Sequence, residues 1–200
     1  MELVPTIFST GWASGVNAYA TVALLGLLGR AGVGEVPEPL QSDAVIAVSL
    51  VMFAIEFVTD KIPYLDNAWD LVHTAVRPAI GSLVGVAFAG DAEVAGIDEA
   101  LAAGGSGTTA LASHAVKAGL RLGINTSPEP FSNILTSLAE DGAVAVVVVF
   151  ALENPELAAL IAAVLLALGA GLAVYLAKRI RRGLTRMRER RLGSPPAGPR

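Results

Sequence analysis

The feature that most constrains this chain is a run of twenty-one uncharged residues, LAALIAAVLLALGAGLAVYLA, at positions 157–177. A helix takes about 20 apolar residues to cross the hydrocarbon core of a bilayer, where lipid offers no partners for exposed backbone groups. The run therefore predicts a membrane-spanning helix. The composition agrees, since 54% of the residues are hydrophobic and 16% are charged, against about 25% charged in soluble domains.

Charge is distributed unevenly about this helix. Positions 178–200 hold nine of the fourteen basic residues and one acid, Glu189, whereas positions 1–177 hold five basic and seventeen acidic residues. Basic residues beside a spanning helix mark its cytoplasmic side, so we expect the C-terminus in the cytoplasm. The predicted parts are a single helical membrane domain at 1–177 and a basic cytoplasmic tail at 178–200, partly helical and then disordered.

The basic tail also suggests partners. Its charges are expected to attract anionic lipid headgroups in the bilayer. Nucleic acid is not an expected partner, because the tail lacks aromatic residues and a fold of its own. The chain has no cysteine, which excludes disulfides and thiolate metal sites.

The remaining apolar segments are short, charged or interrupted by proline. They occupy residues 12–29, 44–58, 79–90, 110–124 and 142–152, with a Pro/Gly/acid loop at 31–43, a polar stretch at 59–78 and an acidic, Gly-rich loop at 91–109 expected outside the membrane. The predicted fold class is an all-α, polytopic helical membrane bundle of about five or six membrane-embedded helices, some short or Pro-interrupted. The alternative, a soluble helical protein, is disfavoured by the total apolar content.

Two of the interruptions resemble each other. One apolar segment ends in TDKIP, closing at Pro63, and another ends in NTSP, closing at Pro128. Aligning these prolines places Asp60 on Asn125 and brings the following apolar runs into step. The match predicts a weak internal duplication, interpreted as an inverted repeat of the kind that forms transporter binding sites. The alternative is a small bundle that contains two kinked helices.

Charged residues in these segments follow helical spacing. Asp66, Asp70, His73 and Arg77 fall at offsets 0, 4, 7 and 11, and His114, Lys117, Arg121 and Asn125 form a similar, mostly basic stripe. Glu56 also lies four residues before Asp60. Each ionisable group at mid-bilayer costs about 2.5–3.5 kcal/mol, so these groups need partners or water. The simplest interpretation is that the two stripes pair and hold the bundle together, which is compatible with a function.

Three chemistries fit these residue types. Arg77, Lys117 and Arg121 suit a phosphate or carboxylate. Asp66, Asp70 and His73 suit a divalent metal, and Glu56, Asp60 or His73 suit a proton relay. The metal pattern is weak because this spacing often occurs by chance, and Asp66 also fits an N-cap.

The stretch SPEPFSN predicts a helix that begins within or near the membrane. Ser127 is placed as its N-cap and Pro128 at its first position. The free amides there suit an anion, and Glu129 is able to act as an internal one. The residues expected to bind substrate are Glu56, Asp60, Lys61, Asp66, Asp70, His73, Arg77, Lys117, Arg121, Asn125, Ser127, Glu129, Asn133, Glu140 and Asp141. No catalytic residue and no cofactor is assigned, and metal ligands stay open.

Several motifs carry a resemblance to a known family. They are E-x-x-x-D-K-I-P at 56–63, R-P-x-x-G at 77–81, A-G-L-R at 118–121, N-T-S-P-E-P-F-S-N at 125–133 and E-D at 140–141. With these motifs the chain resembles, over roughly residues 11 to 180, the bacterial membrane proteins catalogued as domain of unknown function 4126. The resemblance implies a multi-pass protein of a bacterial plasma membrane. It implies no activity.

The leading functional prediction is a small transporter, permease or lipid-type translocator. A central buried polar site would take a small ion or an anionic phosphate or carboxylate substrate. One alternative is a non-transporting scaffold or partner subunit with structural ion pairs, and self-association into a homo-oligomer is left open. Another is a membrane-embedded metal or acid/base enzyme, which is less favoured because the chain has no nucleophile elbow and no H-E-x-x-H motif.

Overall fold

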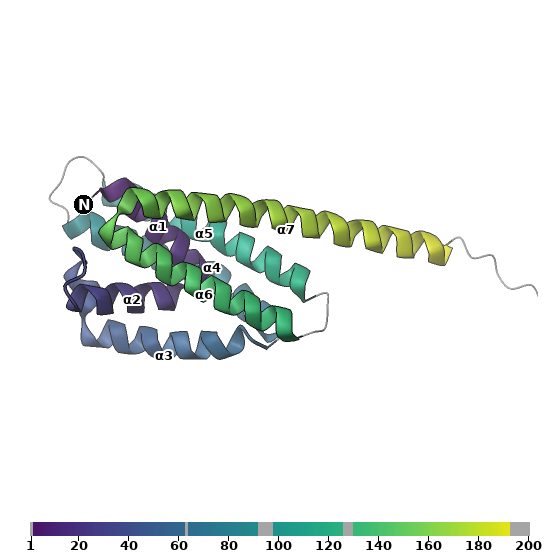
Figure 1. Cartoon of the computed structure of the whole chain (residues 1–200), viewed down its shortest axis with the longest axis horizontal. Coiled ribbons are helices and arrows are strands. Elements are labelled where there is room, and N and C mark those ends of the chain that lie inside the picture. The colour runs from purple at the N-terminus through teal and green to yellow at the C-terminus, as the bar shows by residue number, and fades with distance from the viewer. Residues whose placement is uncertain (1, 63, 92–97, 126–129, 193–200) are drawn as a thin grey trace, which may run out of the picture.

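The computed structural model describes residues 2–62, 64–91, 98–125 and 130–192, and all regular structure in them is helical (Figure 1). The elements are α1 (Leu3–Val16), α2 (Ala18–Arg30), the short 3₁₀ helix η1 (Glu38–Gln41), α3 (Asp43–Thr59), α4 (Leu65–Asp91), α5 (Glu99–Ile124), α6 (Pro130–Glu153) and α7 (Pro155–Leu192). The prediction of an all-α fold is confirmed.

In the part of the chain that the structure describes, three helices are long and apolar enough to cross a membrane, within Leu65–Gly90, Phe131–Glu153 and Pro155–Thr185. This is fewer than the five or six membrane-embedded helices predicted. The bundle is apolar outside, with exposed side chains such as Val51, Leu71 and Leu168, while its centre holds charged groups. Large exposed apolar surfaces need a partner phase. The chain is therefore a membrane protein.

Helices α1, α4 and α5 pack most closely, through glycines. A Cβ on Gly15 would lie 1.9 Å from Ser113 Oγ and 2.1 Å from the carbonyl oxygen of Ala110. A Cβ on Gly85 would lie 2.6 Å from the carbonyl oxygen of Ala102. Small residues let helix backbones approach in this way, so these three helices form a tight inner unit that α2, α3, α6 and α7 surround.

The segment predicted at 12–29 is two helices and not one. The chain breaks at Asn17, whose extended backbone ends α1 and begins α2. The Asn17 side chain accepts from the backbone N–H of Ala20 at 2.9 Å and so caps α2. Figure 1 shows α1 and α2 meeting inside the bundle. Helix α1 starts, and α2 ends, at the same end of the bundle.

Two further boundaries differ from the prediction. The Gly-rich stretch placed in a loop at 91–109 is helical from Glu99, because Asp98 caps α5 by accepting from Ala100 N at 3.1 Å. One of its glycines serves packing, since a Cβ on Gly107 would lie 2.1 Å from Ser82 Oγ. The segment at 79–90 also joins with the part of the segment at 59–78 that follows Tyr64 into the single helix α4, which continues through Pro78.

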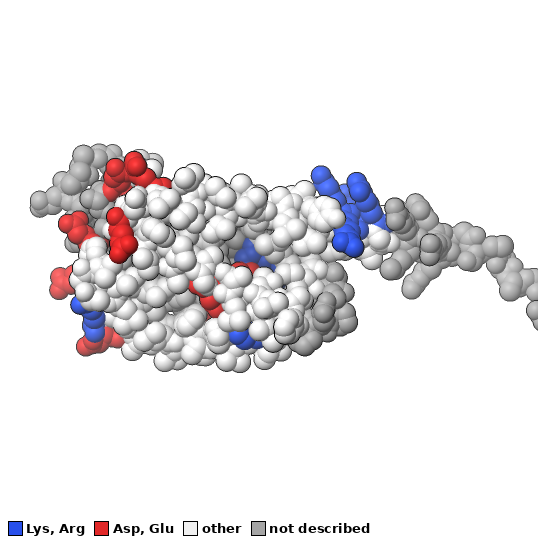
Figure 2. Space-filling view, viewed as in Figure 1, with Lys and Arg blue, Asp and Glu red and all other residues white. Residues whose placement is uncertain are grey.

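Helix α7 passes the domain boundary predicted at 177 and continues to Leu192, beyond the rest of the bundle (Figure 1). The predicted disordered end, 193–200, lies outside the described residues. Figure 2 shows acidic side chains gathered at the opposite end of the bundle and basic ones on the projecting part of α7.

The predicted inverted repeat is corrected by the helix directions. The two aligned segment pairs correspond to α3–α4 and α5–α6, and α3 and α5 run the same way along the bundle (Figure 1). An inverted repeat requires opposite directions. The resemblance between the two pairs therefore relates units of the same orientation.

Candidate functional site

The centre of the bundle holds a buried network of charged side chains organised along α5. His114, Lys117 and Arg121 follow one another at three- and four-residue spacing, which places them on one face of the helix. Each is at most 2% exposed. Their acidic partners come from α3, α4, α6 and the α3–α4 connection, so the acidic and basic stripes do pair, as the sequence suggested.

Arg77 of α4 is fully buried at one end of this network. Its Nη2 donates to Glu56 Oε1 at 2.7 Å and lies 3.1 Å from Asp70 Oδ1. Its Nη1 donates to His114 Nδ1 at 2.7 Å. Because arginine only donates, Nδ1 must be an acceptor, and the proton of His114 lies on Nε2, facing the carbonyl oxygen of Asp70 at 3.1 Å. The arginine thus holds His114 neutral in one tautomer.

Two cations cap the end of α1 inside the bundle. Arg77 Nη1 donates to the carbonyl oxygen of Gly15 at 3.2 Å, and Lys117 Nζ donates to that of Val16 at 3.1 Å. The last carbonyls of a helix lack intrahelical donors and carry a partial negative charge. These two contacts explain why α1 is able to end within the bundle.

Lys117 links the two halves of the network. Its Nζ donates to Asp60 Oδ2 at 2.7 Å and lies 3.5 Å from Glu56 Oε1 and 3.8 Å from Glu140 Oε2. Burial pushes the pKa of Asp60 up, but the charges of Lys117 and Arg121 outweigh burial and hold that pKa below its ordinary value. Asp60 is therefore ionised at neutral pH.

Arg121 forms the other half. Its Nη1 donates to the carbonyl oxygen of Asp60 at 2.7 Å and to Asn133 Oδ1 at 2.9 Å. Its Nε and Nη2 donate to the two carboxylate oxygens of Glu140. This two-pronged contact is the geometry by which arginine binds carboxylates and phosphates. Glu140 thus occupies a position suited to any such anion.

The predicted metal set is not assembled. Asp66 accepts from Asn125 Nδ2 at 3.0 Å on both oxygens, whereas His73 lies elsewhere, with Nε2 3.0 Å from Tyr19 Oη and Nδ1 2.8 Å from the carbonyl oxygen of Trp69. Within the parts of the chain that the structure describes, no three His, Asp or Glu side chains are placed to hold a metal ion.

Some predicted site residues lie apart from the network. Lys61 Nζ donates to the carbonyl oxygen of Phe57 at 2.8 Å and to Ser137 Oγ at 3.3 Å, and lies 3.0 Å from the centre of the Phe57 ring. Ser127 and Glu129, with the proposed cap of α6, lie outside the described residues. They are not placed by the structure.

Three network residues were absent from the predicted site. His114 stands in the basic stripe, so its spacing was a usable signal. Asn17 donates through Nδ2 to Asp141 Oδ1 at 3.0 Å, and a single polar residue within an apolar run was a usable sign of it. Tyr19 contacts His73 through the fold, and nothing in the local pattern indicated this.

The buried charges do not balance. Four acids, Glu56, Asp60, Asp66 and Asp70, are buried with three cations, Arg77, Lys117 and Arg121, and two partly buried acids, Glu140 and Asp141, adjoin them. Buried oxygens of Glu56, Asp60, Asp70 and Asp141 have no hydrogen-bond donor among the described residues. Unpaired buried charge is unfavourable, so the excess of acid suits protons or cations.

A groove connects this network with the outer surface of the bundle. It has a volume of about 290 Å³ and is lined mainly by apolar side chains of α1, α5, α6 and α7, including Trp12, Leu120 and Leu168, with Lys117 and Glu140 among its polar residues. Figure 2 shows basic and acidic atoms at the bottom of a hollow between α6 and α7. Glu140, with a side chain 14% exposed, is the network's most open ion-pairing group among the described residues.

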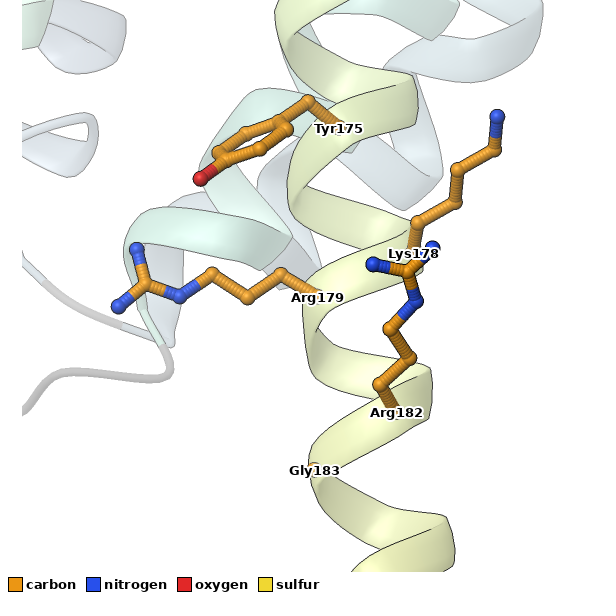
Figure 3. Close-up of a pocket in the computed structure, with 5 residues that line it drawn as sticks. All are labelled: Tyr175, Lys178, Arg179, Arg182 and Gly183. Carbon is orange, nitrogen blue, oxygen red and sulfur yellow. The ribbon is translucent and has the colours of Figure 1, made fainter.

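A second hollow lies on the projecting part of α7. It has a volume of about 480 Å³ and is lined by Tyr175, Lys178, Arg179, Arg182 and Gly183. Figure 3 shows Tyr175 and Arg179 extending to one side of the helix and Lys178 and Arg182 lying together on the other. Its four side chains are exposed, so this is a surface basic site and not part of the buried network.

Comparison with known proteins defines the family and no activity. No curated protein and no solved structure matches the chain. The match to a family covers residues 4–175, which include every described residue of the buried network and the groove. The chain belongs to the family described as "Domain of unknown function (DUF4126)".

Proposed function

We propose that this protein is a small membrane transporter for a lipid-type molecule with an anionic phosphate or carboxylate headgroup. The observation that carries the proposal is the apolar groove that ends at Lys117 and Glu140. Its apolar walls suit a hydrocarbon chain, and its charged floor suits a headgroup. Binding sites of this kind are mostly apolar, with a few placed polar groups.

Arg121 provides the headgroup site in this account. Its Nε and Nη2 already hold a carboxylate, that of Glu140, in the geometry that also fits a phosphate. Glu140 is an internal substitute for the substrate anion. An entering headgroup displaces it from Arg121 and Lys117, and Glu140 returns when the substrate leaves.

The protein would lie in a bacterial plasma membrane with more helices embedded than the three that are long and apolar enough to cross it. Helix α3 has seventeen residues and exposes Val48, Val51, Ile55 and Val58 along one face, which suits contact with lipid. The hairpin α1–α2 would enter and leave from one side, and α5 would cross inside the bundle. With α4, α6 and α7 this gives five crossing helices, and the α1–α2 hairpin is a sixth embedded element.

The basic site on α7 supports the proposed orientation. Lys178, Arg179 and Arg182 would lie at the cytoplasmic surface and bind anionic headgroups, each contributing about 1 kcal/mol. The acidic residues at the opposite end of the bundle would face outward.

Translocation in proteoliposomes tests the proposal. A bulky side chain at Ala143, which lines the groove, should block it, whereas the same side chain at Val146, 47% exposed on the same helix, should not. With fluorescent phosphatidylglycerol as the probe, Ala143→Phe is expected to reduce the rate at least about tenfold, equivalent to about 1.4 kcal/mol in the barrier, and Val146→Phe to leave it unchanged. Equal rates in both variants would remove the groove from the account.

A second candidate is a non-transporting scaffold with structural ion pairs. The deep burial of Glu56, Asp60 and Arg121, each at most 2% exposed, favours it. In that case phosphatidylglycerol would show no protein-dependent translocation, and Arg121→Lys would change stability only.

A further inference from the structure

Asp141 differs from every other acid of the network. Glu56, Asp60, Asp66, Asp70 and Glu140 each have a basic side chain within ion-pair distance. Within the described residues Asp141 has none. Its Oδ1 accepts from Asn17 Nδ2 at 3.0 Å, and its buried Oδ2 has no hydrogen-bond partner among the described residues.

The Asn17 contact is fixed in direction. Its Oδ1 is used to cap α2 by accepting from Ala20 N at 2.9 Å. The amide nitrogen is therefore the group that faces Asp141, and it is a neutral donor. It satisfies one carboxyl oxygen and leaves the other without a donor.

The charged groups facing Asp141 are all committed to other partners. Lys117 of α5 and both Asp60 and Lys61 of the α3–α4 connection act on it electrostatically, and Glu140 is its neighbour on α6. Lys117 donates to Asp60, and Lys61 donates to Ser137 Oγ at 3.3 Å. Neither cation lies within ion-pair distance of the Asp141 carboxylate in the described structure, and the α1–α2 junction contributes only the neutral amide of Asn17.

From this geometry we propose that Asp141 is a proton-binding site, a neutral carboxylic acid at neutral pH with its proton on Oδ2. A carboxylate oxygen that is buried with no donor and no cation beside it is strongly disfavoured, and such a group takes up a proton instead. The proton comes from water and forms the Oδ2–H bond. On release the bond breaks, the proton returns to water and its electron pair stays on the carboxylate.

Lys61 supplies the means of release. It contacts Ser137, which is four residues before Asp141 and on the same face of α6. Reorientation of the long Lys61 side chain from Ser137 toward Asp141, which already acts on it electrostatically, would bring the ammonium group to the carboxylate and stabilise it. The proton and Lys61 therefore compete for one carboxyl group.

In the proposed transporter this site couples proton movement to the substrate. That role rests on the proposed function, whereas the proton site does not. Asp141 lies beside Glu140 on α6, so its charge state changes the field at the anion position of the groove.

Infrared spectroscopy of the purified protein without substrate tests the proton site. The carbonyl stretch of a protonated carboxylic acid should be present at neutral pH in the wild-type protein and in Glu153→Gln, an exposed control on the same helix. It should be lost in Asp141→Asn. Absence of the band from the wild type, or its persistence in a folded Asp141→Asn protein, would overturn the proposal.

A second variant and a second readout separate the two claims. Should Asp141→Asn fail to fold, Asp141→Glu is expected to shift the frequency of the band, and an unshifted band would count against the site. Phosphatidylglycerol translocation then tests coupling. The rate is expected to depend on pH in the wild type and not in Asp141→Asn, and an unchanged pH profile would overturn the coupling role while the infrared result stands.

Discussion

The close packing of α1 against α5 gives the sharpest quantitative prediction. A Cβ on Gly15 would lie 1.9 Å from Ser113 Oγ and 2.1 Å from the carbonyl oxygen of Ala110. The hydroxyl is able to rotate away, but the carbonyl belongs to the backbone of α5. Relief therefore requires one helix to move, and overpacking of this kind costs about 1–3 kcal/mol or more.

For Gly15→Ala we expect the free energy of unfolding to fall by about 3 kcal/mol, near the upper end of that range. The reason is that α1 is also hydrogen-bonded to Arg77 and Lys117 and is not free to shift. In a protein of this size about 1 kcal/mol changes the melting temperature by about 2–4 °C, so the expected fall is about 6–12 °C. The assay is thermal unfolding of the purified protein in detergent, followed by circular dichroism.

Gly104→Ala is the matched control. It lies within α5, and a Cβ there meets nothing within 4 Å. Alanine in place of glycine in a helix adds about 0.5–1 kcal/mol, so this variant should melt slightly above the wild type. A Gly15→Ala protein that melts with the wild type, or a Gly104→Ala protein that falls as far as Gly15→Ala, would refute the described packing.

Three further predictions concern the charges. Arg77→Met should destabilise the protein by about 3–5 kcal/mol, because Glu56 and Asp70 remain buried without their cation. Chemical unfolding of Arg77→Met, Glu56→Gln and the double variant should give a coupling energy of about 0.5–3 kcal/mol between Arg77 and Glu56. Strictly additive effects of the two substitutions would contradict the ion pair. Since Lys117 and Arg121 hold the pKa of Asp60 below its unfolded value of 3.8, the stability from this group is present above that pH and is lost as the pH falls through the folded value. The melting temperature should therefore fall less steeply in acid for Asp60→Asn than for the wild type. Parallel curves of melting temperature against pH would show that ionised Asp60 does not stabilise the fold in this way. Replacing Lys178, Arg179 and Arg182 with Gln should reduce the affinity for phosphatidylglycerol by about a hundredfold, at about 1 kcal/mol per charge, as measured by the lipid retained in native mass spectra. Arg30→Gln, at the other end of the bundle, should leave this affinity unchanged. Equal losses in both variants would argue against a headgroup site on α7.

The sequence predicted the helical class, the membrane setting and the pairing of two charged stripes because these follow from local regularities. A long apolar run and charges at helical spacing can each be recognised within the sequence of a single helix. The stripes ending at Arg77 and Asn125 could be recognised because two buried sets of opposite charge need each other.

What the sequence did not predict depends on contacts between distant segments. The break at Asn17 is stable because Arg77 and Lys117 donate hydrogen bonds to the last carbonyl oxygens of α1. These two residues lie 62 and 101 positions along the chain from the carbonyl groups they contact. The Gly-rich stretch that suggested a loop at 91–109 is helical from Glu99, and Gly107 within it allows α5 to approach α4 closely. The groove is formed by four helices, and no local pattern indicates such a surface.

The central claim is that a lipid-type molecule enters the groove between α6 and α7. The chain has two tryptophans, Trp12 and Trp69, and Trp12 lines the groove although it is only 5% exposed. The most direct measurement is the fluorescence of a Trp69→Phe protein in bilayers of phosphatidylglycerol with brominated acyl chains. Our account predicts that these chains quench Trp12 and that Ala143→Phe abolishes the quenching; Trp12 fluorescence unaffected by brominated lipid would contradict it.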